Sequence, residues 1–306
     1  MRLRSAGESD FPRVAELIHA STNAWYQRNG KSAIFTAGPE SCMLFCQVYE
    51  DLDPGCCIVA EDESTGRLMG SCFYHPRDTH VSLGIMNVHP EFFGRGVASA
   101  LLRFITDLAD REQEPIRLVS SAMNLDSFSL YTKQGFMPRA AFQDMIISVP
   151  AEGLPRTVSR LERVRAATMA DIANMVALEE RVSGIRREKD YRYFLENRLG
   201  IWHVSVLDDG RGGLAGFLCS VAHPASTMLG PGFMRDQNDA AALILAEISV
   251  RRGLSPVFLV PVDQSELVRT LYSWGARNCE IHFAQVRGRF QPFAGVVMPT
   301  FMPETG

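Results

Sequence analysis

Residues 88–102 read Val-His-Pro-Glu-Phe-Phe-Gly-Arg-Gly-Val-Ala-Ser-Ala-Leu-Leu, and this stretch decides the fold. Apolar residues alternate at 81, 83 and 85 and continue at 86 and 88, which predicts a strand, and apolar side chains at helical spacing follow the glycines. Glycine permits turn dihedrals and lets a ligand approach the backbone closely. Because the first N–H groups of a helix lack partners and carry partial positive charge, Gly94 to Ser99 are predicted to bind a diphosphate, with Arg95 adding a charge contact.

The same stretch does not match the two common nucleotide-binding patterns. No Gly-Lys-Ser/Thr follows it, so it is not a P-loop. Gly94 and Gly96 begin a G-x-G, but the third small residue is displaced to Ser99 or Ala100 and no acidic ribose partner follows. An ordinary tight turn before a helix is the alternative interpretation.

A second stretch, residues 124–136, reads Asn-Leu-Asp-Ser-Phe-Ser-Leu-Tyr-Thr-Lys-Gln-Gly-Phe. Together with residues 88–102 it resembles the GNAT superfamily of acetyl-CoA-dependent N-acetyltransferases. The family's Arg/Gln-x-x-Gly-x-Gly/Ala turn, which binds the CoA pyrophosphate, corresponds to Phe93, Gly94, Arg95, Gly96, Val97 and Ala98. The family's Asn…Tyr…Gly-Phe segment corresponds to Asn124, Tyr131, Gly135 and Phe136. Phe93 departs from the family's Arg or Gln, so the resemblance implies a phosphate grip that rests on backbone amides.

The resemblance also implies roles for individual residues, with acetyl-CoA as the cosubstrate. The implied CoA-binding residues are Met86, Val88, Gly94, Arg95, Gly96, Val97, Ala98, Ser99, Asn124 and Ser127. The Val88 N–H would polarise the thioester carbonyl, and Tyr131 would protonate the leaving thiolate. Asn124 would hydrogen-bond the pantetheine arm. The alternatives are a packed Tyr131 at a helix–sheet seam and an Asn124 that caps a helix.

The general base and the acceptor site are less clearly encoded. Many family members carry a glutamate early in the strand before the turn, where this sequence has Leu-Gly-Ile at 83–85. Glu61, Asp78, His80 and a chain of water molecules are the possible substitutes. In the family the segment between the first two helices shapes the acceptor site; here this segment supplies Trp25, Tyr26 and Arg28. The alternative interpretations are that Trp25 and Tyr26 pack in the core and that Arg28 is a solvated surface charge.

An internal repeat predicts two copies of one α/β unit. Arg2–Ala6 and the helix pattern after it match Arg163–Ala167 and its following helix. Two further pairs match in the same order: a glycine-bounded strand that ends at His-Pro 75–76 or 223–224, and a Leu-Tyr helix end followed by Gly135 or Gly275. The proline-bracketed segment 150–155 is the predicted linker, so the expected domains are 1–150 and 151–306.

The predicted fold class is α/β: two tandem GNAT-like domains, each a central mixed β-sheet flanked by helices. The expected helices are 10–20, 39–51, 96–110, 125–134, 169–182, 187–197, 237–252 and 264–274. The expected strands are 1–5, 56–61, 68–75, 81–88, 116–122, 141–149, 201–207, 214–222, 256–262 and 281–287, with a short strand at 163–167.

The second copy is predicted to have a degenerate CoA site. In the approach to the helix at 237–252 the glycines come too early, and Asp236 and Asp239 stand at the helix start. Carboxylates there suit the helix dipole but repel a pyrophosphate. Tyr272, which matches Tyr131, is then a structural residue. The aromatic, proline-rich tail 292–306 is expected either to fray or to pack across the domain seam.

Composition excludes several other classes. The 306 residues carry 31 Lys and Arg against 35 Asp and Glu, a net charge of −4, which argues against a nucleic-acid or polybasic membrane binder. No apolar run is long enough for a membrane span, and the start has no signal-peptide core. The seven cysteines form no C-x-x-C pair and predict reduced thiols in a cytoplasmic protein without a metal site.

The sequence therefore predicts an acetyl-CoA-dependent N-acetyltransferase that acts through a ternary complex. A small-molecule amine is the expected acceptor rather than a protein, and the chain is expected to be a monomer (a pseudo-dimer of its halves) or a homodimer. The alternatives from other classes are a CoA or acyl-CoA sensor without turnover and a metabolite-binding scaffold with a site between the halves.

Overall fold

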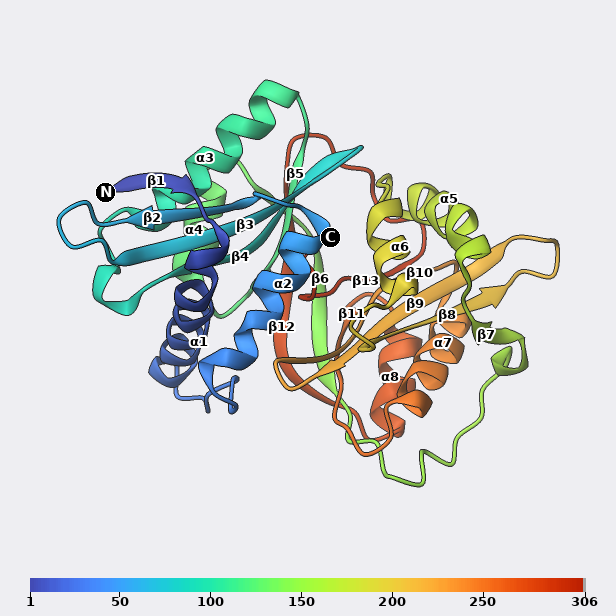
Figure 1. Ribbon diagram of the computed structural model, residues 1–306. Helices are drawn as coiled ribbons and strands as arrows, with labels where there is room; N and C mark the ends of the chain where they lie inside the picture. Colours follow the sequence, from blue (N-terminus) through green and yellow to red (C-terminus); the bar gives the residue numbers. More distant parts are fainter. Residues whose placement is uncertain (305–306) are drawn as a thin grey trace. The chain divides into compact units, whose positions relative to one another are not determined.

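The computed structural model describes residues 1–304, which divide into two compact units. The first contains 1–76, 80–116 and the tail residues 303–304, and the second contains 77–79 and 117–302. In each unit helices cover both faces of a β-sheet, which confirms the mixed α/β class (Figure 1). None of the helices in the described part of the chain is long and apolar enough to cross a bilayer.

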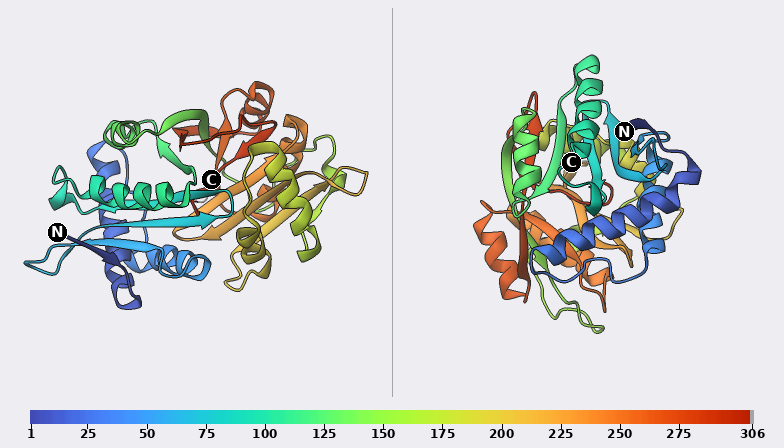
Figure 2. Two further views of the ribbon diagram at one scale, coloured as in Figure 1. Left: turned by 90° about the horizontal axis from the view of Figure 1, so that it is seen from above. Right: turned by 90° about the vertical axis from the view of Figure 1, so that its left-hand side faces the viewer.

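The sheet of the first unit has the order β1-β2-β3-β4, and β1–β2 and β2–β3 are antiparallel. Helices α1 and α2 lie on one face and α3 on the other (Figures 1 and 2). The elements are β1 Arg2–Ser5, α1 Phe11–Arg28, α2 Met43–Leu52, β2 Cys57–Glu61, β3 Leu68–Arg77, β4 His80–Val88, the 3₁₀ turn η3 Pro90–Phe92 and α3 Val97–Glu112.

The sheet of the second unit has the order β5-β12-β6-β11-β10-β9-β8-β7, with β13 also paired to β10. Helices α5 and α6 lie on one face, and α7 and α8 on the other (Figure 1). The elements are β5 Ile116–Ser121, α4 Leu125–Lys133, β6 Met137–Ile146, β7 Val164–Ala166, α5 Ile172–Ser183, α6 Glu188–Glu196, β8 Trp202–Asp208, β9 Leu214–His223, β10 Ser226–Met234, α7 Gln237–Val250, β11 Val257–Pro261, α8 Ser265–Ser273, β12 Arg277–Arg287 and β13 Val296–Met298.

Helix α3 packs tightly on the first sheet because the sequence supplies an apolar stripe and a missing Cβ. Val97, Leu101 and Ile105 recur at helical spacing and are buried. A Cβ on Gly70 of β3 would lie 2.9 Å from Val97 Cγ1 and 2.8 Å from the Asn87 carbonyl oxygen. The glycine therefore lets the first turn of α3 approach β3 and β4 closely.

The same ion-pair arrangement recurs in both copies of the predicted repeat. Arg4 donates to both carboxylate oxygens of Asp10, at 2.6 and 2.9 Å, and its Nε donates to Glu61 at 2.8 Å. Arg165 donates to both oxygens of Asp171, at 2.9 and 2.8 Å, and its Nε donates to Asp208 at 3.0 Å. This equivalence of three positions supports duplication of one ancestral unit.

We expect Asp171→Asn to lower the free energy of unfolding by about 1–2 kcal/mol at pH 7, a range that allows for solvent screening of the half-exposed Arg165. The hydrogen bonds from Arg165 hold the pKa of Asp171 at about 2, below its ordinary 3.8. Stability from this pair is therefore present above about pH 4 and is lost as the pH falls toward 2. Urea unfolding of wild type and variant at pH 7 and pH 3 measures this loss of stability, with the exposed Asp107→Asn as the control variant. A stability difference from wild type of equal size at both pH values contradicts the assignment.

Strand β6 explains why the compact units do not divide at the predicted linker. It lies in the first predicted domain, yet it pairs antiparallel with β11 and with β12 of the second. Strand β12 in turn is the neighbour of β5. The last strands of the two copies are thus exchanged, and the boundary near residue 150 stays a prediction.

Three expectations need correction. Helix α1 continues to Arg28 rather than ending near residue 20, because no glycine or proline interrupts it before Gly30. Trp25, Tyr26 and Arg28 therefore lie on the helix and not on a segment between helices. Strand β10 was not expected, since the Gly-Pro-Gly at 230–232 is untypical of a strand; the ladder crosses it with a register shift. The tail does not fray over 296–298, where β13 pairs with Gly232–Met234.

Candidate functional site

The turn between β4 and α3 has the backbone that the sequence predicts for a phosphate cradle. Gly94 and Gly96 have φ of +74° and +78°, values that residues with a Cβ rarely adopt. A Cβ on either glycine would meet no atom within 4 Å, so the space beside both is open. Gly96 is the N-cap of α3, and no side chain caps this helix start. The first N–H groups of α3 are therefore available to an anion.

Three guanidinium groups lie against the aromatic rings that precede this turn, and one of them, Arg67, is paired with Glu91 at 2.7 Å. The Cζ atom of Arg28 lies 5.0 Å from the centre of the Phe93 ring, and those of Arg67 and Arg95 lie 5.4 and 5.3 Å from the centre of the Phe92 ring. Cations attract anions most where a helix start already favours negative charge. Arg28 thus brings positive charge to Phe93, the position where the family pattern has Arg or Gln.

Strand β4 leads into the turn and carries the other predicted residues of the first unit. Met86 and Val88 are half-buried on it. Between them lies Asn87, whose Oδ1 accepts a hydrogen bond from Ser21 Oγ at 2.7 Å and whose buried Nδ2 has no partner among the described residues. Sequence reasoning missed Asn87; the only signal was a polar residue inside an apolar strand.

Helix α1 carries the predicted acceptor residues. Trp25 stands four residues after Ser21, on the same side of the helix, and Ser21 touches Asn87 of β4. The Trp25 and Tyr26 rings meet edge to face with centroids 4.9 Å apart. Helix α1 therefore carries an aromatic pair one turn after the residue that contacts Asn87, whose Nδ2 has no partner among the described residues; these groups suit a small polar acceptor.

The remaining predicted residues lie on α4, in the second unit. Asn124 is the N-cap of α4: its Oδ1 accepts from the Ser127 N–H at 3.0 Å, so the capping alternative holds for this oxygen. Tyr131 is 7% exposed, and its ring lies 5.8 Å from that of Phe136. The structure therefore places Asn124, Ser127 and Tyr131 within two turns of one helix.

The corresponding helix start of the second copy is built differently. Asp236 caps α7, and its side chain accepts from the N–H groups of Asn238 and Asp239. Arg160 donates to both Asp236 and Asp239. The amides that an anion would need are thus already bonded, and a carboxylate occupies their place.

The strands beside α7 are also closed to a ligand. Strands β10 and β11 pair only at Met228–Val257 and Leu229–Phe258 and then separate. The chain's own β13 pairs with β10 beyond that point and also contacts β11. A ligand could enter between β10 and β11 beyond the point where they separate, but β13 lies there in this copy.

One cluster has the donor types of a metal site. Asp144, Glu280 and His282 bring oxygen and nitrogen atoms within 4.8 Å of one another, and all three residues are buried. His282 Nδ1 bonds to Asp144 Oδ1 at 2.9 Å, and Ser121 Oγ donates to Glu280. This geometry is that of a buried hydrogen-bond network, which sequence reasoning did not anticipate.

Candidate general bases are restricted by their contacts. Glu61 accepts from Arg4, His80 is fully buried, and Asp78 stands exposed on the β3–β4 turn.

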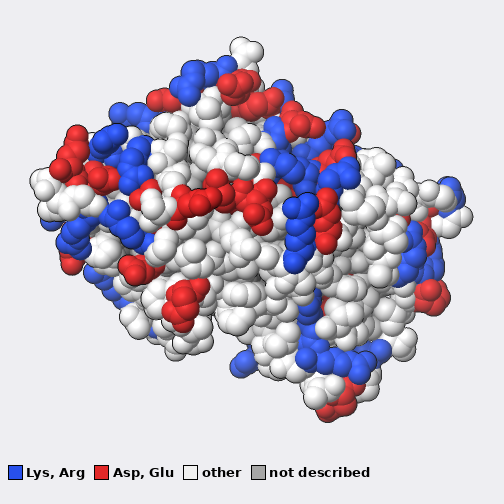
Figure 3. All heavy atoms as spheres, in the orientation of Figure 1, with Lys and Arg blue, Asp and Glu red and all other residues white. Residues whose placement is uncertain are grey.

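On the face drawn in Figure 3, Lys and Arg side chains lie among Asp and Glu side chains, and no wholly basic stripe crosses it.

Comparison with known proteins agrees with this geometry. Residues 53–138 match the family model of the acetyltransferase (GNAT) domain. The UPF0157 protein YqkA of Bacillus subtilis (strain 168) is 32% identical over 87 residues, 28% of this chain and 25% of the relative, so the match spans only a quarter of that relative's length.

Solved structures resemble the chain along nearly its whole length. A putative acetyltransferase from Pyrococcus horikoshii is 13% identical with a TM-score of 0.75, and the match covers 100% of this chain and 95% of that one. A GCN5-related N-acetyltransferase from Sphaerobacter thermophilus is 17% identical with a TM-score of 0.66, covering 95% and 98%. A tandem GNAT protein from the clavulanic acid biosynthesis pathway is 13% identical with a TM-score of 0.60, covering 93% and 97%. At these identities the likeness shows the fold.

Proposed function

We propose that the chain, whose residues 53–138 match the acetyltransferase (GNAT) domain and whose fold is that of solved tandem GNAT proteins, transfers an acetyl group from acetyl-CoA to the amine of a small molecule, with one CoA site per chain at the start of α3. The observation that carries this proposal is the uncapped α3 start with two positive-φ glycines and open space beside them. The capped start of α7 supports a single site, since Asp236 uses the equivalent amides.

Acetyl-CoA fits the residues at this turn. The amides of Gly96, Val97, Ala98 and Ser99 would hold the diphosphate, and Arg28 and Arg95 would neutralise part of its charge. The free Nδ2 of Asn124 would bind the pantetheine, since only its Oδ1 is used in capping. Bound acetyl-CoA supplies a thioester activated for acyl transfer.

The chain's own groups then have three tasks. The backbone N–H of Val88 would stabilise negative charge on the carbonyl oxygen, a role usually worth several kcal/mol. The Tyr131 hydroxyl would give its proton to the leaving sulfur. Glu61 is paired with Arg4, His80 is buried and Asp78 is exposed on the β3–β4 turn, so we propose that the acceptor amine loses its proton to water.

The acceptor is proposed to bind against α1, beside the Ser21–Asn87 contact and the Trp25–Tyr26 pair one turn further along the helix. An aromatic wall with one amide donor favours a small amine over a protein substrate. The test is release of free thiol from acetyl-CoA with a panel of small amines and with peptides. Turnover with a small amine is expected; CoA binding without turnover against any amine points instead to a CoA sensor.

We expect Arg28→Met and Arg95→Met each to weaken CoA binding about 3- to 10-fold, or roughly 1 kcal/mol. Both side chains are exposed, so the loss should shrink as ionic strength rises. Calorimetric titration with CoA at low and high salt measures it. Arg111→Met, at the far end of α3, is the matched control and should bind as wild type does. Equal affinities for all three variants at low salt contradict the electrostatic role.

A further inference from the structure

The α7 pocket is an open hollow in the surface of the second unit, beside the start of α7. Its walls come from β6, the turn after β11, the start of α7 and the segment 290–296 that leads into β13, all within the second unit. Solvent can enter about 590 Å³ of this hollow. Pockets that hold small organic molecules usually have about 300–1,000 Å³, so the α7 pocket has the size of a ligand site.

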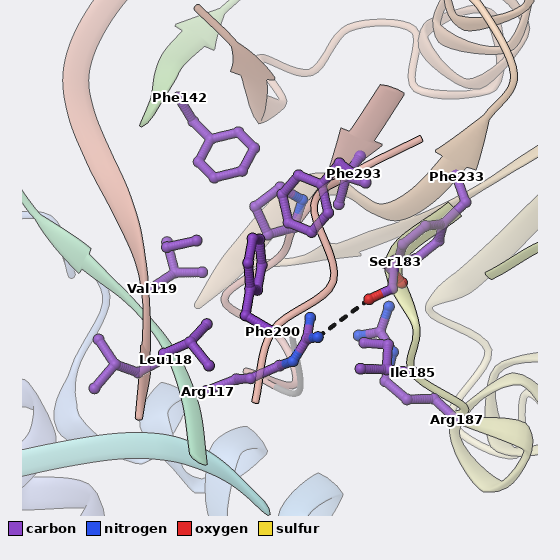
Figure 4. Close-up of a pocket in the computed structure, with 14 residues that line it drawn as sticks. Arg117, Leu118, Val119, Phe142, Ser183, Ile185, Arg187, Phe233, Phe290 and Phe293 are labelled. Carbon is purple, nitrogen blue, oxygen red and sulfur yellow. Dashed lines mark hydrogen bonds between the residues drawn. The ribbon is translucent and has the colours of Figure 1, made fainter. Parts of the chain in front are cut away.

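Two aromatic rings form an apolar wall of the α7 pocket. Phe290 and Phe293 both line it, and their rings pack edge to face with centroids 5.5 Å apart. The same rings line a smaller cavity beside Arg117, whose buried Nε has no hydrogen-bond partner in the described chain (Figure 4). That cavity has about 20 Å³, room for about one water molecule. Of the two spaces, the α7 pocket is therefore the one that can admit an organic molecule.

Two of the charged side chains that line the α7 pocket are already paired. Arg235 donates to Asp209 Oδ2 at 2.8 Å. Asp236 accepts from Arg160 at 2.8 Å and also caps α7. Each has an opposite charge within hydrogen-bond distance, so a ligand would have to compete for either of them.

The other two charged residues of the pocket, Arg139 and Asp263, have opposite signs and belong to neighbouring strands. Arg139 is on β6, and Asp263 follows β11, which pairs antiparallel with β6. The Cζ atom of Arg139 lies 5.4 Å from the centre of the Phe290 ring, and Asp263 accepts from Gln264 Nε2 at 3.2 Å. Within the described part of the chain no ion pair holds either residue. The pocket thus offers one cation and one anion that are not joined to each other.

Two half-buried amide side chains add hydrogen-bonding groups to the same pocket. Gln237 Oε1 accepts from the Leu267 N–H at 2.8 Å, which leaves Gln237 Nε2 as a donor without a partner among the described residues. Gln264 uses its Nε2 to bond Asp263, which leaves its Oε1 as an acceptor. A ligand in the α7 pocket would therefore meet a donor and an acceptor besides the two charges.

We propose that the α7 pocket binds a small zwitterion of the α-amino acid class with an apolar side chain. The ligand's carboxylate would pair with the planar guanidinium group of Arg139, and its ammonium group would pair with Asp263. Its side chain would lie against the rings of Phe290 and Phe293. A phosphate ester fits less well, because the unpaired charges of the pocket sum to zero and Asp236 already bonds the first amides of α7. This proposal does not rest on the proposed CoA site at the start of α3.

The test uses the full chain, without acetyl-CoA, and L-phenylalanine as the probe. Two analogues with the same ring lack one charge each: 3-phenylpropionate has no ammonium group, and phenethylamine has no carboxylate. Phenylalanine is expected to raise the melting temperature in a concentration-dependent way. In calorimetric titrations each analogue is expected to bind about 3- to 10-fold more weakly than phenylalanine, since it loses one of two partly exposed charge pairs.

Substitution of the two charged residues should affect the probes in a crossed pattern. Arg139→Met is expected to weaken phenylalanine and 3-phenylpropionate about 3- to 10-fold and to leave phenethylamine unchanged. Asp263→Asn is expected to weaken phenylalanine and phenethylamine and to leave 3-phenylpropionate unchanged. Both residues are exposed, so neither change threatens the fold. Arg198→Met, exposed and outside the pocket, is the control and should bind all three probes as wild type does.

The proposal is overturned if phenylalanine binds no more tightly than its two analogues, or if Arg139→Met and Asp263→Asn both bind it as wild type does. Phenylalanine is also an amine, so Trp25→Ala tests whether it occupies the proposed acceptor site instead. A loss in Trp25→Ala with wild-type binding in Arg139→Met rejects the α7 pocket; the opposite result supports it. Gly96→Glu should leave phenylalanine binding intact, which separates this proposal from the fate of the CoA site.

Discussion

Gly96→Glu is expected to weaken CoA binding about 100-fold or more, which corresponds to about 2.7 kcal/mol. Gly96 has φ of +78°, so any Cβ there strains the helix start. The new carboxylate would also enter the open space beside α3, where the diphosphate is proposed to bind, and would repel it. Calorimetric titration of the variant with CoA measures the loss.

Two companion variants separate strain from charge. Gly96→Ala adds the strain alone and should keep most of the affinity. Gly212→Glu is the matched control, because Gly212 also has a positive φ, +88°, and open space around it, but lies on an exposed loop of the second unit. Retained CoA affinity in Gly96→Glu, or an equal loss in Gly212→Glu, contradicts a diphosphate site at α3.

Tyr131→Phe is expected to lower kcat about 100-fold or more while leaving the affinity for CoA unchanged. The Tyr131 ring packs against Phe136, and phenylalanine preserves that contact, so the variant removes only the hydroxyl proton donor. Steady-state kinetics and CoA titration of the same preparation separate the two effects. An unchanged kcat across the pH range contradicts the general-acid role.

The internal repeat supplies the control for this experiment. Tyr272 occupies the matching position of the second copy, where it is 46% exposed and donates its hydroxyl to Gln143 at 3.0 Å. Tyr272→Phe is therefore expected to turn over acetyl-CoA at the wild-type rate. A loss equal to that of Tyr131→Phe would mean that both changes act through folding and not through chemistry.

Most elements could be predicted from sequence because their signals are local. The glycines before α3 and the apolar stripe within it place its start within one residue, and Asp236 marks the capped start of α7. The expected strands agree where apolar alternation is uninterrupted. The sequence does not predict strand β10 because Gly230 and Pro231 are untypical of strands; β9 pairs with the residues on both sides of them, and β13 pairs with Gly232–Met234.

The parts that sequence could not predict depend on contacts between distant segments. Strands β6 and β12 each pair with strands of the other copy, and local sequence patterns do not encode which of two similar sheets a strand joins. Arg28 was assigned to the acceptor by its position in the chain, whereas the structure brings it to Phe93, 65 positions later. The unsatisfied Nδ2 of Asn87 and Nε of Arg117 become visible only once burial and every neighbour are known.

A crystal structure of the intact chain with CoA tests the central claim most directly. We predict one molecule per chain, with its diphosphate within hydrogen-bond distance of the backbone amides at residues 96–99. A CoA bound instead at Asp236 and Tyr272, or a second molecule there, would contradict the account.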